Sequence, residues 1–170
     1  MTKDELKAKI VEGAVRLAQA AGRARLDFAA LDDELSADTI RVAMGRVTSV
    51  VESSLAALDA VKGDYDELNA LLPPVEKEFG AQAKESLLHI LNSVQDLHSR
   101  VSLLGRASRE ADRLEDEVAN GSAPAGSQAS LDTMLSKNQR VVRELGGFRE
   151  KNVSPDEILN TAVRDLHASL

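Results

Sequence analysis

The chain has 170 residues and a net charge of −7, so it is long enough for one domain and too short for two ordinary ones. Hydrophobic residues make up 43% of it but aromatic residues only 2%, which favours aliphatic helix-on-helix packing over a β-sandwich or barrel. The acidic balance argues against nucleic-acid or anionic-membrane partners, and the absence of cysteine excludes disulfides and thiolate metal sites.

The first expected helix covers residues 3–22, where apolar residues recur at steps of three and four along one face. Gly22 is its expected end, and a less regular connection is expected to complete an N-terminal segment of residues 1–35. A long helix of coiled-coil type is expected over 39–72, where the same steps persist. Gly63 predicts a local weakening inside it, since glycine costs about 1 kcal/mol relative to alanine within a helix.

A Pro73-Pro74 pair then predicts a tight turn, because proline lacks an N–H and disfavours helical geometry in the residue before it. Another long helix is expected over 75–119, antiparallel to the one before, so that residues 36–119 form a helical hairpin. The small and polar stretch NGSAPAGSQAS, residues 120–130, is expected to be a flexible linker.

Residues 131–170 are expected to form two further helices. The first covers 131–145 and is closed by Gly146-Gly147, and the second is capped by Ser154. The second has an apolar face that either completes the bundle or binds in a groove of a partner. That face consists of Ile158, Leu159, Ala162, Val163 and Leu166. The predicted fold is therefore all-α, with a long antiparallel hairpin forming a four-helix bundle and extra N- and C-terminal helices.

Asp96 and Arg100 are the candidate site residues of the helix over 75–119. They lie four residues apart beside its apolar seam, and an ion pair on a solvated face is the simple structural interpretation. His98 lies between them but lacks the H-x-x-K-G context of a phosphotransfer histidine. The three histidines are isolated from one another, so no metal site is predicted.

The segment QDLHSRV, residues 95–101, resembles the QDLTGQV segment of the CheZ chemotaxis phosphatases. In that family the segment lies on the second long helix of an antiparallel hairpin. The first hairpin helix is similar as well, because Ala57, Leu58, Ala60 and Val61 match an AL-x-AV pattern. The order of N-terminal helix, hairpin, linker and C-terminal helix also agrees.

The resemblance implies a mechanism and a departure from it. CheZ proteins bind the phosphorylated receiver domain of CheY and hydrolyse its aspartyl phosphate with a D-x-x-x-Q motif. The Asp pairs with a receiver lysine, and the Gln orients the attacking water. Asp96 stands at the Asp position, but Arg100 stands at the Gln position. Arginine only donates hydrogen bonds, so it cannot accept one from that water, and we expect weak or absent phosphatase activity.

The resemblance further implies a cytoplasmic homodimer whose partner is a CheY-type response regulator or another chemotaxis protein, such as the methyltransferase CheR. No cofactor is expected, since Mg²⁺ would belong to the receiver domain. No apolar run approaches the ~18 residues of a membrane span, and the charged start does not resemble a signal peptide.

Three alternatives stay open. In the first, the chain is a flagellar or secretion export chaperone, an acidic helical hairpin that sequesters an apolar helix of its substrate. In the second, it is an active response-regulator phosphatase in which Arg100 replaces the catalytic Gln of the family. Finally, its own helices complete the bundle, so that it is a monomer instead of a homodimer.

Overall fold

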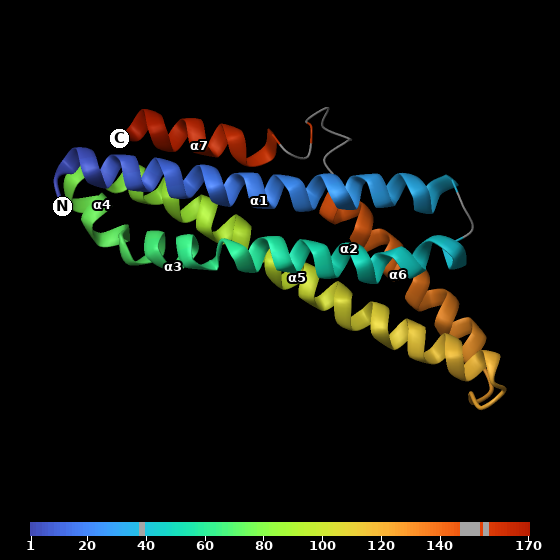
Figure 1. The fold of residues 1–170 in the computed structure, drawn as a ribbon. Helices are drawn as coiled ribbons and strands as arrows, with labels where there is room; N and C mark the ends of the chain where they lie inside the picture. The colour runs from blue at the N-terminus through green and yellow to red at the C-terminus, as the bar shows by residue number, and fades with distance from the viewer. Residues whose placement is uncertain (38–39, 147–153, 155–156) are drawn as a thin grey trace.

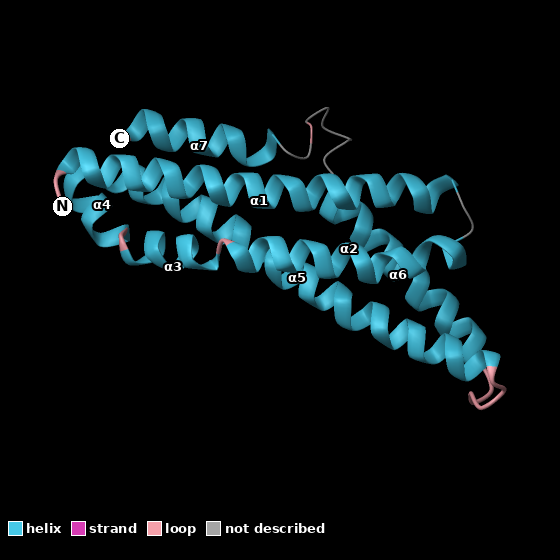
Figure 2. Ribbon diagram, in the orientation of Figure 1, coloured by secondary structure: helices cyan, strands magenta, loops and turns pink. Residues whose placement is uncertain are grey.

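The computed structural model describes residues 1–37, 40–146, 154 and 157–170. All regular secondary structure in these residues is helical, which confirms the all-α prediction. The helices, shown in Figures 1 and 2, are α1 (Lys3–Ala37), α2 (Ile40–Ala60), α3 (Lys62–Ala70), α4 (Leu72–Phe79), α5 (Ala81–Ala119), α6 (Ser127–Gly146) and α7 (Ile158–Ser169). None of these helices is long and apolar enough to cross a membrane.

The helices form a four-helix bundle within one chain. Helices α1 and α5 occupy opposite corners, and each packs against both α2 and α6. Helices α3 and α4 continue the α2 corner toward the end of the molecule where the N-terminus lies (Figure 1). Helix α7 packs on α1 and α5 beyond the end of α6. The expected bundle is therefore present, and the N- and C-terminal helices are members of it.

Aliphatic side chains fill the centre of the bundle, as the composition predicts. Phe28 is the largest fully buried side chain, and most of the others are leucines and isoleucines. The large aliphatic side chains that are fully buried are Ile10, Leu17, Leu35, Leu68, Leu87, Ile90, Leu91, Leu97, Leu104, Leu131 and Leu145.

Helix α1 continues through Gly22 to Ala37, so the predicted end at Gly22 is wrong. The apolar stripe continues past the glycine with Phe28, Leu31 and Leu35, all of which are buried. Burying one such side chain contributes roughly 1.5–3 kcal/mol, which outweighs the ~1 kcal/mol helix cost of one glycine. The stripe is thus a stronger signal than the single glycine.

The chain reverses in two steps where the sequence predicts one tight turn. Pro73 and Pro74 stand in the first turn of α4, where a missing N–H costs no helical hydrogen bond. The second step is at Gly80, whose φ of 100° lies in the region that favours glycine. The second long helix therefore begins at Ala81 instead of residue 75. A further break at Val61 separates α2 from α3, two residues before Gly63.

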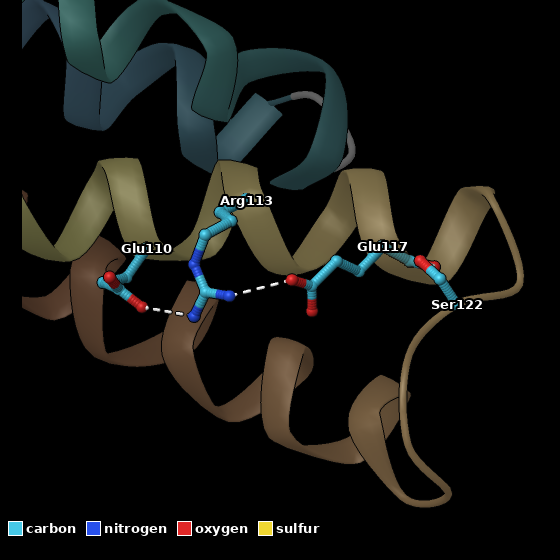
Figure 3. A network of polar contacts seen from close by, with 4 residues as sticks. All are labelled: Glu110, Arg113, Glu117 and Ser122. Atoms are coloured by element: carbon cyan, nitrogen blue, oxygen red, sulfur yellow. Dashed lines mark hydrogen bonds and ion pairs between the residues drawn. The ribbon is translucent and has the colours of Figure 1, made fainter.

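Helix α5 ends in a Schellman motif that turns the chain toward α6. The Gly121 N–H donates to the Val118 carbonyl (3.2 Å), and the Ser122 N–H donates to the Glu117 carbonyl (3.0 Å). Gly121 has a φ of 70°, as this motif requires. In the preceding turns, Arg113 donates to the carboxylates of Glu110 and Glu117, both at 2.8 Å (Figure 3). Helix α6 then begins at Ser127, so the connection is shorter than the predicted linker.

Candidate functional site

Asp96 and Arg100 lie near the middle of α5, beside its buried seam of Leu97 and Val101. The Arg100 Nε atom is 3.1 Å from the Asp96 Oδ2 atom, so the two side chains form the expected ion pair one helical turn apart. More than half of each side chain is exposed, 60% for Asp96 and 54% for Arg100. The pair is therefore accessible to another molecule.

Arg25 of α1 adds a third charge close to this pair. Its Nη1 atom donates to the Leu145 carbonyl (3.1 Å) at the C-terminal end of α6, where carbonyls lack helical partners. Burial lowers the pKa of Arg25, and the nearby Arg100 cation lowers it further, while Asp96 raises it. Asp96 and Arg100 thus face the side of α5 that adjoins α1 and α6. The sequence analysis missed Arg25, whose only signal is a cation within the apolar stripe of α1.

A second polar group lies on the other side of the α5 seam. The His98 Nε2 atom is 3.0 Å from the Asp59 Oδ1 atom of α2. The Tyr65 hydroxyl of α3 donates to the Gln95 Oε1 atom at 2.9 Å. These four residues line a surface cavity of about 200 Å³. The acidic partner of His98 is Asp59, so Asp96 and His98 do not form a catalytic dyad.

The pair on α5 can bind charged groups, but Arg100 cannot accept a hydrogen bond from an attacking water. Among the described residues the Asp96 carboxylate forms an ion pair only with Arg100 and accepts no hydrogen bond from elsewhere, so it can accept from an incoming cation. Arg100 can donate to a phosphoryl or carboxylate oxygen. The nearest side-chain amide in sequence belongs to Gln95, whose Oε1 atom is bound to Tyr65 on the opposite flank.

No metal site accompanies the pair in the part of the chain that the structure describes. There, no group of three or more His, Asp or Glu side chains is arranged to hold an ion.

The apolar face of α7 is docked on the bundle. Leu159 and Leu166 are buried in the core, and the half-buried Ala162 and Val163 pack against it. The fifth predicted contact residue, Ile158, has a side chain outside the described part of the structure. Helix α7 contacts both α1 and α5, so completion of the bundle accounts for its apolar face.

Comparisons of the chain with models of known protein families, with curated proteins and with solved structures find no match. These comparisons therefore assign neither the bundle nor its D-x-x-x-R pattern to a known family.

Proposed function

We propose that the protein is a cytoplasmic CheZ-like chemotaxis protein that binds a signalling partner through α5 and has weak or absent phosphatase activity. The partner is a phosphorylated CheY-type receiver domain, or another protein of the pathway such as the methyltransferase CheR. The observation that carries this proposal is the exposed Asp96–Arg100 pair in the middle of a 39-residue helix.

The geometry of Asp96 supports binding to a basic partner group. Its carboxylate forms an ion pair only with Arg100 within the described residues, and that ion pair is solvated. Such pairs contribute about 0–1 kcal/mol, so a lysine of a partner can join or replace Arg100 at little cost. This is the role that the resemblance implies for Asp96.

The chemistry of Arg100 argues against catalysis. In-line hydrolysis needs a group that accepts a hydrogen bond from the water and directs its lone pair at phosphorus. A guanidinium has only donors, and Arg100 is already paired with Asp96. Arg100 can hold a phosphoryl oxygen of a phosphorylated partner, but it cannot orient the attacking water.

Titration of a CheY-type regulator from the same organism tests the binding. The regulator is activated with beryllofluoride, labelled with a fluorophore and titrated with the full chain. We expect binding at micromolar concentrations and a loss of about tenfold in affinity for Asp96→Ala, since an interfacial ion pair is removed. The matched control is Asp116→Ala, which removes another exposed aspartate near the end of the same helix and should leave affinity unchanged.

Equal affinities for the two variants would remove Asp96 from the interface. Absence of binding up to about 100 µM, a Kd well outside the usual signalling range, would contradict the receiver proposal. CheR and an apolar helix from a filament-type export substrate are then titrated in the same way. Binding of the export helix alone would replace the proposal with the export-chaperone alternative.

A further inference from the structure

A groove of about 440 Å³ runs along the surface between α5 and α6. Its apolar lining consists of Leu103, Leu104, Ala107, Met134 and Val141. Leu103 is 60% exposed, which is unusual for a large aliphatic side chain in this protein. Asn138 also lines the groove but is only 3% exposed, so it adds little to the exposed surface. An exposed apolar wall of this kind marks a surface that another molecule can cover.

Charged residues stand at the two ends of the groove in a pattern that is complementary to itself. Arg100 and Glu110 line it from α5, and Lys137 and Glu144 line it from α6. Because α5 runs toward the turn at 120–126 and α6 runs away from it, Arg100 and Glu144 share one end while Glu110 and Lys137 share the other. Each end thus carries one positive and one negative charge.

A two-fold rotation about an axis that crosses the groove at its midpoint places opposite charges of two copies against each other. It lays α6 antiparallel on α6 of a second copy, so that Lys137 of each copy faces Glu144 of the other. The same rotation brings Arg100 toward Glu110. Lys137 and Glu144 have no ion-pair partner in the described part of their own chain. Arg100 already pairs with Asp96, and Glu110 already pairs with Arg113 (Figure 3). The ion pairs made by α6 therefore contribute most to the contact.

We propose that this groove is the contact face of a homodimer, with a second copy of the chain lying antiparallel across it. The contact differs from the one that the family resemblance implies, in which two hairpins combine to make the bundle. Here each chain completes its own bundle, and the dimer face lies outside that core. The inference does not depend on the receiver-binding proposal.

The expected dimer is weak. The groove spans eleven residues of each helix, 100–110 and 134–144, or about 15 Å at the rise of an α-helix. This is a small patch compared with a stable interface of about 800 Å² per partner, so dissociation constants in the micromolar range are expected.

Sedimentation velocity of the full chain at concentrations up to about 500 µM, beyond a micromolar Kd, tests the proposal. The wild type should shift from monomer to dimer, and Lys137→Glu should raise the Kd about tenfold or more, because it places like charges opposite each other. The double substitution Lys137→Glu, Glu144→Lys reverses both members of each pair and should restore the wild-type Kd. Lys77→Glu makes the same charge change on exposed α4, outside the groove, and should have no effect.

A second variant tests the apolar wall without changing the ion pairs. Leu103→Asp should also weaken the dimer, and far-UV circular dichroism checks that each variant remains helical. A wild type that stays monomeric throughout the range overturns the proposal. So does a dimer that Lys137→Glu weakens no more than Lys77→Glu does, or one that the double substitution fails to restore.

Discussion

Gly146 sets the contact between the end of α6 and the backbone of α1. A Cβ atom at this position would lie 2.6 Å from the Ala29 Cα atom and 2.8 Å from the Phe28 carbonyl carbon. Both neighbours are backbone atoms within a helix, so they cannot rotate away as the tip of a side chain can. The sequence marks this glycine only as a helix end, and the close approach is a property of the packed bundle.

We expect Gly146→Ala to lower the free energy of unfolding by about 1–3 kcal/mol, the usual cost of overpacking. Gly63→Ala is the matched control, because Gly63 is exposed within α3 and a Cβ there meets nothing within 4 Å. That variant should raise the free energy of unfolding by about 0.5–1 kcal/mol, through the better helix propensity of alanine. Urea unfolding followed by circular dichroism measures both, and a Gly146→Ala protein as stable as the wild type would show that α6 can move away from α1.

The position of the candidate site follows from local sequence, while its surroundings do not. A spacing of four residues places Asp96 and Arg100 on one face of any α-helix, and the structure pairs them at 3.1 Å. Arg25 lies 71 residues before Asp96 in the chain, and only the packing of α1 beside α5 and α6 brings it close. The Asp59–His98 contact is likewise made between helices, which no single-helix pattern can reveal.

Among the helices, α7 occupies the same corner of the bundle as α6, beyond the end of α6 at Gly146. Its Leu166 is fully buried and Leu159 nearly so, in contact with the core that α1 and α5 build. The sequence predicts this helix and its apolar face but cannot say what the face contacts. In this structure the bundle itself provides the contact.

Truncation of Leu166 tests how much the docking of α7 contributes. Leu166→Ala should lower the free energy of unfolding by about 2–4 kcal/mol, since it leaves a cavity in the core. Leu103→Ala removes the same atoms from a largely exposed position and should change stability by less than about 0.5 kcal/mol. Both are measured by urea unfolding at low protein concentration, where the chain is monomeric. Similar small effects for the two variants would mean that α7 leaves the bundle readily in solution.

Helix boundaries were predictable where a local stop signal and the apolar stripe agree. The start of α6 is displaced by four residues, from 131 to Ser127, and its end at Gly146 lies one residue beyond the predicted end at 145. The stripe overrides Gly22 in α1, and the Pro73-Pro74 pair begins a short helix instead of forming the turn. In both cases the glycine or proline has the expected backbone preference, but the packing of the helices determines whether a helix ends there.

At the scale of the whole molecule, apolar periodicity predicts that several helices bury one face each, which is enough to predict a bundle. It does not tell whether the faces meet within one chain or between two. The structure brings α1 and α6 against the α2–α5 pair, so all four corners come from a single chain. Because the apolar seam of α5 is already covered, only the exposed residues of α5 can contact another molecule.

We propose that α5 presents a site that binds a phosphorylated receiver domain, and that this site lacks the glutamine needed to orient water for hydrolysis of the phosphate. The most direct measurement is the decay of a phosphorylated CheY-type regulator from the same organism, alone and with saturating wild-type chain or the Arg100→Gln variant. We predict that the wild type changes the decay rate by less than about twofold, since Arg100 has no acceptor with which to orient water, and that Arg100→Gln accelerates it. Acceleration of about tenfold or more by the wild type, or about 1.4 kcal/mol off the barrier, abolished by Asp96→Ala, would contradict this and make Arg100 part of an active phosphatase.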